Sequence, residues 1–222
     1  MHIAPVFAVP LGQANFPGSE ILNAELRHLF LSREAQGSKF ANPNPSLKQQ
    51  PGVFESEFDL FSWPDTCVQE LRKFCWKQLG MLVQELNGYT DAELARIQIF
   101  SHTWFHVTRH GGFVLSHTHP MASWSGVYCV APGHSPADRP DSGVLKFHNP
   151  HHYSNTFLDA GNLRPVPPYH HGTWNVRFAA GDLVIFPSWL QHEVLPFHGD
   201  DERITVAFNC WFGQRPGLNA SQ

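Results

Sequence analysis

Hydrophobic side chains in the first part of the chain recur at intervals of three and four, the spacing that places them on one face of an α-helix. The clearest stripe consists of Val68, Leu71, Cys75, Leu79, Leu82 and Leu86. It predicts a helix that begins at Ser62 or Asp65 and ends at Gly88. A shorter helix is predicted over residues 19–30, and one further helical turn over residues 91–96.

From Ile97 onward the hydrophobic positions change to the alternating pattern of β-strands. The predicted strands cover residues 97–107, 113–119, 123–130, 144–147, 174–178, 183–186, 193–197 and 203–212. Turns that contain glycine and proline separate them. This pattern indicates a mainly β fold, a double-stranded β-helix (jelly roll, cupin-like) with bracing N-terminal α-helices.

The chain is expected to form a single domain. Its parts would be a helical N-terminal support at residues 1–95, a jelly-roll core at residues 96–213 and a tail at residues 214–222. Residues 32–52 and 131–142 are predicted to be loops, because glycine and proline gather there. Residues 148–173 form an irregular excursion rich in histidine, proline and asparagine.

Composition narrows the class of protein. The 222 residues are 42% hydrophobic and only 15% charged, with a formal net charge of −4. The sequence has no cluster of Lys and Arg residues that could bind the phosphates of a nucleic acid. It also has no apolar run that approaches the roughly 20 residues needed to span a membrane. Without a recognisable signal peptide, we expect a cytoplasmic protein with four reduced core thiols and a small-molecule substrate. A homodimer is the candidate oligomeric state.

Histidine is the outlier in the composition, with fifteen copies that lie mostly between His102 and His192. His117 and His119 are two apart on a predicted strand, so their side chains project from the same face. They are either two polar residues at the end of a strand or half of a metal site. Because distant strands of a jelly roll converge at one open end, His192 could complete a facial set of three ligands.

Four motifs occur in order along the predicted jelly roll. They are His-Thr-His-Pro at residues 117–120, Ser-Gly-Val-Tyr at 125–128, Gly-Asp-Leu-Val-Ile-Phe-Pro-Ser-Trp-Leu-Gln-His at 181–192 and Arg-Ile-Thr-Val-Ala-Phe-Asn at 203–209. Together they resemble the 2-oxoglutarate/Fe(II)-dependent oxygenase superfamily, closest to a bacterial branch with a His-x-His-Pro motif and mostly unassigned substrates. The resemblance covers about residues 97–212.

The resemblance implies Fe(II) and 2-oxoglutarate as cofactors, with His117 and His192 as two metal ligands. It implies that Arg203 grips the distal carboxylate of 2-oxoglutarate, a bidentate task for which a guanidinium is suited. Thr205 would add a hydroxyl donor, and Tyr128 is a candidate second partner of the cosubstrate. The alternative for Arg203 is an ion pair at the surface with a neighbouring carboxylate of residues 200–202.

The sequence departs from the superfamily at His119, which stands where the usual triad has Asp or Glu. Three interpretations remain open. His119 replaces the carboxylate as third ligand, or it turns away and leaves an open position, or the metal and its chemistry differ. We favour the first, because Arg203 would have no obvious task in a three-histidine thiol dioxygenase.

The function expected from these residues is a non-haem Fe(II)- and 2-oxoglutarate-dependent oxygenase that hydroxylates a small molecule. His102, Trp104 and His106 share one face of a predicted strand and are candidate substrate residues, although a role in the core or at its rim would also explain them. The rival functions are a three-histidine dioxygenase of cupin type that does not use 2-oxoglutarate, and a non-catalytic jelly-roll binding module.

Overall fold

The computed structural model describes residues 1–45 and 51–214. Its helices are α1 (Glu20–Glu34), α2 (Thr66–Asn87) and α3 (Asp91–Leu94), with two short 3-10 helices, η1 (Gly37–Lys39) and η2 (Leu60–Ser62). Its strands are β1 (Gly12–Asn15), β2 (Val53–Glu55), β3 (Ile97–Thr108), β4 (Val114–His117), β5 (Trp124–Ala131), β6 (Leu145–His148), β7 (Thr173–Val176), β8 (Asp182–Pro187), β9 (His192–Val194) and β10 (Arg203–Gln214). Strands β3 to β10 correspond to the eight predicted from the sequence, with ends that differ by a few residues.

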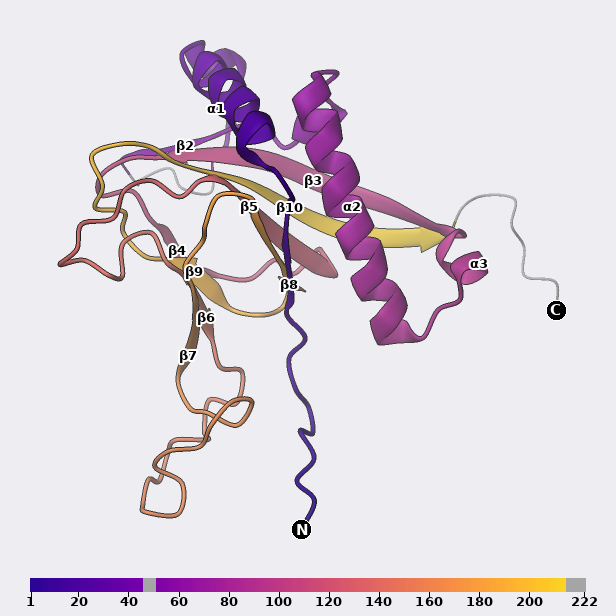
Figure 1. Ribbon diagram of the computed structural model, residues 1–222, viewed down its shortest axis with the longest axis vertical. Coiled ribbons are helices and arrows are strands. Elements are labelled where there is room, and N and C mark those ends of the chain that lie inside the picture. The colour runs from indigo at the N-terminus through magenta and orange to yellow at the C-terminus, as the bar shows by residue number, and fades with distance from the viewer. Residues whose placement is uncertain (46–50, 215–222) are drawn as a thin grey trace.

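The strands form two antiparallel sheets that face one another (Figure 1). The larger sheet has the order β1-β8-β5-β10-β3-β2, and the smaller has the order β4-β9-β6-β7. Strands that are far apart in the sequence are therefore neighbours, as β3 and β10 show by pairing from Thr108 opposite Arg203 to Ile97 opposite Gln214. This arrangement confirms the predicted mainly β jelly-roll fold.

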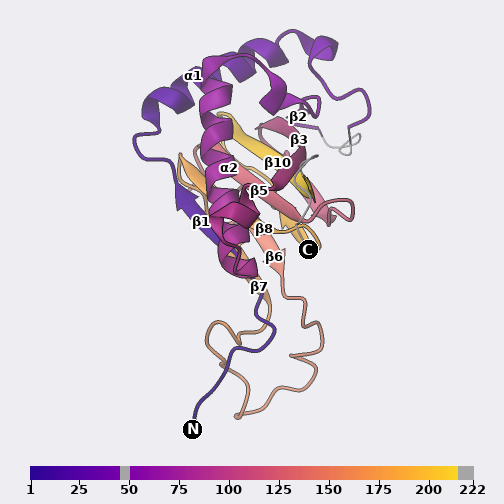
Figure 2. The ribbon, with the colours of Figure 1, turned by 90° about the vertical axis from the view of Figure 1, so that its right-hand side faces the viewer.

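Helices α1 and α2 pack on the outer face of the larger sheet (Figures 1 and 2). Leu26 of α1 and Leu71 of α2 are completely buried there, and each such side chain contributes about 1.5–3 kcal/mol by leaving water. Helix α2 follows Asp65 and ends at Gly88, whose positive φ of 66° suits a residue without a Cβ. The predicted bracing by N-terminal helices is thus observed.

Three segments differ from the prediction or fall outside it. The predicted loop at residues 32–52 contains the end of α1 and all of η1, while residues 46–50 lie outside the described residues. Strand β2 was not predicted, because three residues are too few to show an alternating pattern; it pairs with β3 and sets Glu55 opposite His106. Of the predicted tail, residues 215–222 lie outside the described residues.

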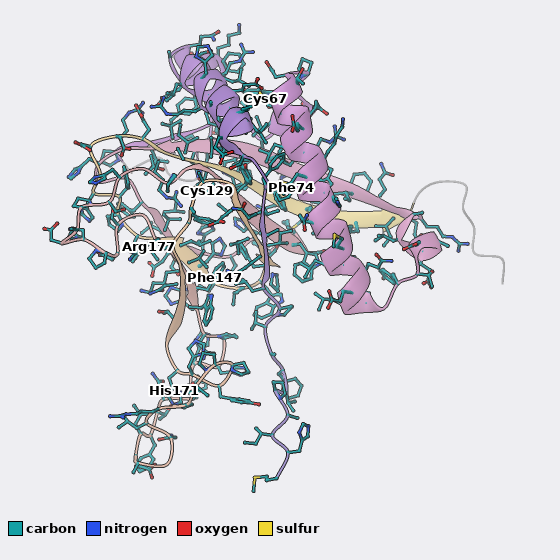
Figure 3. All side chains as sticks on the ribbon, viewed as in Figure 1. Cys67, Phe74, Cys129, Phe147, His171 and Arg177 are labelled. Atoms are coloured by element: carbon teal, nitrogen blue, oxygen red, sulfur yellow. The ribbon has the colours of Figure 1, made fainter. Side chains whose placement is uncertain are left out.

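A second hydrophobic core fills the space between the two sheets. It includes Cys129 of β5, Leu145 and Phe147 of β6, and Val184 and Phe186 of β8. Figure 3 shows Cys129 and Phe147 on the sheets, away from Cys67 and Phe74 on α2. Both faces of the central strand β5 are consequently buried, one against the helices and one against the smaller sheet.

Residues 1–11, which precede β1 and form an N-terminal arm, extend from the same end of the molecule as the excursion between β6 and β7 (Figures 1 and 2). His171 lies out on this excursion (Figure 3). The two segments line a cavity of about 510 Å³ whose walls include Phe147 and Leu190. Among the described residues, no helix is both long and apolar enough to cross a membrane.

Candidate metal centre

Three histidine side chains converge where β4 ends and β9 begins. His117 is the last residue of β4 and lies directly opposite His192, the first residue of β9; His119 follows just after β4. The ring centroids are 4.3 Å apart for His117 and His192, 4.7 Å for His117 and His119, and 5.1 Å for His119 and His192. One ligand nitrogen from each ring lies within 4.8 Å of the others. The structure thus brings the three predicted ligands together as a group that could hold a metal ion.

Backbone carbonyl groups orient two of the three imidazoles. His117 Nδ1 lies 2.6 Å from the carbonyl oxygen of Leu115, and His192 Nδ1 lies 2.8 Å from that of Leu190. A carbonyl oxygen only accepts hydrogen bonds, so each Nδ1 carries the hydrogen and donates it. Nε2 of both neutral rings therefore keeps the lone pair that a metal ion binds.

Burial keeps these imidazoles neutral. It lowers the pKa of His192 to about 3 and that of His119 to about 4, and repulsion from His117 adds to the shift in both. The pKa of His117 is also lowered, chiefly by burial. A protonated imidazole cannot bind a metal ion, so depressed pKa values leave all three side chains available as ligands at neutral pH.

A chain of polar side chains, two buried serines and the half-buried Asn209, approaches His119 from the larger sheet. The amide nitrogen Nδ2 of Asn209 lies 3.0 Å from His119 Nδ1. Ser125 Oγ donates to Asn209 Oδ1 at 2.7 Å and lies 2.8 Å from Ser188 Oγ. Ser125 and Ser188 lie within the four ordered motifs, but no role was predicted for either from the sequence.

Arg203, the first residue of β10, places a buried cation beside the histidines. Its side chain is 4% exposed, and its Nη2 atom has no hydrogen-bond partner among the described residues. The surface ion pair considered from the sequence is wrong, because Glu202 pairs instead with Arg27 and Arg109, and Asp201 accepts a backbone N–H. Burial disfavours the charged form and lowers the pKa of the Arg203 guanidinium. An anion bound at Nη2 would offset the free-energy cost of burying this positive charge.

A small cavity of about 50 Å³ connects the three histidines with Arg203. Thr205 lines it, on the same face of β10 as Arg203, and Trp104 and His106 line it from β3. The structure therefore places Thr205, Trp104 and His106 at the cavity that the three histidines line. Its apolar walls come from both sheets and include Val127, Leu145, Phe186 and Val194.

Glu55 holds His106 at the wall of this cavity. Its Oε2 atom lies 3.0 Å from His106 Nε2, and its Oε1 atom accepts a hydrogen bond from Asn42 Nδ2 at 2.8 Å. The indole nitrogen of Trp104 lies 3.1 Å from the same His106 Nε2. Glu55 was not identified from the sequence, because it lies on the short strand β2 and in none of the four motifs.

Two predicted site residues lie elsewhere. Tyr128 points from β5 into the helical core, where its hydroxyl donates to Asn23 Oδ1 at 2.8 Å. It is on the opposite face of the sheet from Arg203, and its predicted contact with the cosubstrate is wrong. His102 shares a face with Trp104 but lies farther along β3; it is exposed and contacts the rings of Phe58 and Trp211 instead of lining the cavity.

Comparison with known proteins supports the interpretation of this site. Residues 102–209 match the model of a family described as "Putative 2OG-Fe(II) oxygenase", and no curated protein sequence matches the chain significantly. The fold is similar to that of a prolyl-4-hydroxylase from Pseudomonas putida, with a TM-score of 0.58 and 20% identity over 93% of this chain and 94% of that one. A prolyl hydroxylase from Trichoplax adhaerens, in complex with a hypoxia inducible factor peptide, gives a TM-score of 0.55 at 14% identity over 90% and 83%. HygX from Streptomyces hygroscopicus, with nickel, 2-oxoglutarate and hygromycin B bound, gives 0.51 at 12% identity over 94% and 84%.

The predicted resemblance to the 2-oxoglutarate/Fe(II)-dependent oxygenases is therefore supported by a match to this family over residues 102–209. The matched region carries all three histidines and Arg203, and the jelly-roll fold is shared with solved members. Its cofactors are therefore Fe(II) and 2-oxoglutarate. The residues present fit these cofactors, since three neutral imidazoles suit a divalent transition metal, and the Arg203 guanidinium, whose buried Nη2 has no hydrogen-bond partner among the described residues, suits a carboxylate.

Proposed function

We propose that this protein hydroxylates a small-molecule substrate, using Fe(II) held by His117, His119 and His192 together with 2-oxoglutarate. The observation that carries the proposal is the buried Arg203 guanidinium, which has an unpartnered Nη2 and lines the same cavity as the three histidines. A buried cation without a partner is costly. A dianionic cosubstrate bound between the metal and Arg203 would account both for the buried Nη2 atom without a partner and for the cavity that Arg203 shares with the three histidines.

Each end of the cosubstrate has a suitable partner in the chain. Arg203 offers its fork of N–H donors to the distal carboxylate, and Thr205 offers a hydroxyl from the next position on the same face of β10. When bound, Fe(II) and 2-oxoglutarate supply the oxidative decarboxylation that activates dioxygen for attack on a substrate C–H bond. Apolar side chains such as Leu145 and Phe186 line the space between and exclude water from it.

The substrate side of the metal is assigned to Trp104 and His106. The Trp104 ring lies 6.4 Å from the His119 ring, between centroids, and His106 is oriented by the buried Glu55. The larger cavity, of about 510 Å³, has the size of a small-molecule site. Its walls include Leu190, whose carbonyl oxygen accepts from His192, and Phe147, whose ring lies 5.9 Å from the His192 ring. Both cavities support a small organic substrate.

Arg203 also decides between this function and its nearest rival. A three-histidine dioxygenase that does not use 2-oxoglutarate would need the metal ligands but no buried cation beside them. Replacing Arg203 should therefore abolish activity in the proposed enzyme and have little effect in the rival.

The test is an anaerobic titration of the Fe(II)-loaded protein with 2-oxoglutarate, followed by exposure to air and measurement of succinate. The wild-type protein and the control Arg164→Met, at an exposed position on the excursion, should bind 2-oxoglutarate and form succinate. Arg203→Met should bind Fe(II) normally but lose 2-oxoglutarate affinity by tenfold or more. Absence of both 2-oxoglutarate binding and succinate formation in the wild-type protein would overturn the proposal.

A further inference from the structure

His119 differs from the other two ligands in what holds its Nδ1 atom. For His117 and His192 the partner is a backbone carbonyl two residues earlier, which can only accept. For His119 it is the side-chain amide of Asn209, which comes from β10 in the other sheet and lies 3.0 Å away. An amide has both a donating and an accepting end, so the chemistry of His119 depends on which end faces it.

The two orientations of the Asn209 amide have opposite consequences for metal binding. If the amide nitrogen donates to Nδ1, the hydrogen of the neutral imidazole must reside on Nε2, which then has no lone pair for an ion. If the amide oxygen faces Nδ1, His119 donates from Nδ1 and Nε2 is free to bind. Turning the amide by 180° exchanges the two ends without moving any neighbouring heavy atom.

Two buried hydroxyl groups can hold the amide in the second orientation. Ser125 Oγ is 2.7 Å from the other end of the Asn209 amide and 2.8 Å from Ser188 Oγ. In that orientation the amide nitrogen donates to Ser125 Oγ, and the Ser125 hydroxyl donates onward to Ser188 Oγ. The side chains of Ser125 and Ser188 are buried, so water does not compete for these bonds.

Ser188 also fixes the backbone of His119. The His119 N–H donates to the Ser188 carbonyl at 2.9 Å. One residue therefore holds the main chain of this ligand directly and, through Ser125 and Asn209, reaches its imidazole ring. Ser125, Ser188 and Asn209 are motif residues to which no role in cosubstrate binding has been assigned, and these hydrogen bonds link all three to His119.

We infer that Asn209 is the positioning residue that makes His119 a metal ligand. Its amide oxygen accepts Nδ1–H of His119, the pair Ser125 and Ser188 holds the amide in that orientation, and Nε2 of His119 faces the other two ligands. The inference rests on the three-histidine metal site of the proposed function. It adds the reason why a histidine can stand in the position of a carboxylate, which needs no tautomer to be selected.

The first test reads the tautomer of His119 in metal-free protein. Long-range proton–nitrogen correlation spectra show which ring nitrogen carries the hydrogen, and the His119→Gln variant identifies the His119 signals. The wild-type protein should show the hydrogen on Nδ1, and Asn209→Ala should shift it toward Nε2. Asn209→Asp, which keeps an accepting oxygen, should restore the wild-type pattern. A spectrum with the hydrogen on Nε2 in the wild-type protein, or no change in Asn209→Ala, would overturn the inference.

The second test measures Co(II) affinity without 2-oxoglutarate. Asn209→Ala should weaken binding about 10- to 100-fold, the usual effect of removing a partner of a ligating histidine, and Asn209→Asp should not. Asn23→Ala is the control, because Asn23 is a buried asparagine that accepts a side-chain hydrogen bond, from Tyr128, on the other face of the sheet. An equal loss of affinity in Asn23→Ala and Asn209→Ala would reduce Asn209 to a general structural role and refute the inference.

These readouts separate the inference from the function it rests on. Neither uses turnover, so a protein that selects the His119 tautomer and binds Co(II) as described but forms no succinate would disprove only the oxygenase proposal. A protein that turns over 2-oxoglutarate while Asn209→Ala leaves both readouts unchanged would disprove only the role of Asn209.

Discussion

His117 lies directly opposite His192 in the pairing of β4 with β9, and their ring centroids are 4.3 Å apart. The two residues are far apart in the sequence, and the antiparallel pairing of β4 with β9 brings them together as a cross-strand pair. Because each ring is also held by a hydrogen bond from Nδ1 to the carbonyl oxygen of the residue two positions earlier, this half of the metal site is organised before an ion arrives.

The histidine pair and His119 should account for metal binding by the protein. Replacing His117 or His192 by Gln is expected to lower Co(II) affinity at least tenfold, because a ligand of the ion is lost. The control is His151→Gln, a histidine exposed on the excursion. Isothermal titration of metal-free protein checks this, and a comparable loss in His151→Gln would place the ion elsewhere.

Gly143 should control the position of Arg203. It has a positive φ of 63°, and a Cβ built there would lie 2.9 Å from Arg203 Cδ. Gly143→Ala is therefore expected to cost about 1–2 kcal/mol of backbone strain and, in addition, to displace the guanidinium and weaken 2-oxoglutarate binding.

Gly88 provides the matched control for that substitution. Its φ of 66° is almost the same, but nothing lies within 4 Å of a Cβ at this position. Gly88→Ala should lose similar stability in urea unfolding and leave 2-oxoglutarate affinity unchanged. Equal 2-oxoglutarate affinity in the two variants would show that Arg203 is not displaced or does not hold the cosubstrate.

The metal-free protein should lose stability as pH falls below about 6.5, the ordinary pKa of histidine in an unfolded chain. Burial lowers the pKa of His119 to about 4 and of His192 to about 3 in the folded state. Between these values the unfolded chain binds protons that the folded chain does not, so stability rises with pH across this window, by about 1.4 kcal/mol per pH unit for each such group.

Urea unfolding in the presence of a chelator, at several pH values between 4 and 7, measures this dependence. His192→Gln removes one of the titrating groups and should flatten the slope relative to the wild-type protein. An identical slope in the variant would mean that His192 titrates in the folded protein as it does in the unfolded chain.

The four cysteines should be inert in the native protein. All of them are free and buried, and burial raises the pKa of Cys129 and of Cys210 to about 12. Since the thiolate is the reactive form, iodoacetamide at pH 8 is expected to modify none in the folded protein and all four in denaturant. Mass spectrometry of the intact protein counts the modified thiols, and rapid modification without denaturant would contradict the burial of these side chains.

The local pattern of the sequence determined much of the fold. The stripe at intervals of three and four on residues 68–86 defined α2 and its buried face, and alternation after Ile97 defined the strands of the jelly roll. It also predicted that His117 and His119 lie close together as neighbours on one strand face. The two rings are close, with centroids 4.7 Å apart, although β4 ends at His117 and His119 lies beyond the strand. The ordered motifs then identified His192 and Arg203 as their partners.

Only the tertiary structure decided which face of each strand lines the cavity between the three histidines and Arg203. Both faces of β5 are buried, so alternation could not show that Tyr128 points to the helices while Cys129 points between the sheets. Pairing between distant strands likewise brought Glu55 to His106 and Asn209 to His119. A sequence records the period of a strand, but contacts across strands depend on register and on which neighbour pairs, and these are set when the sheets assemble.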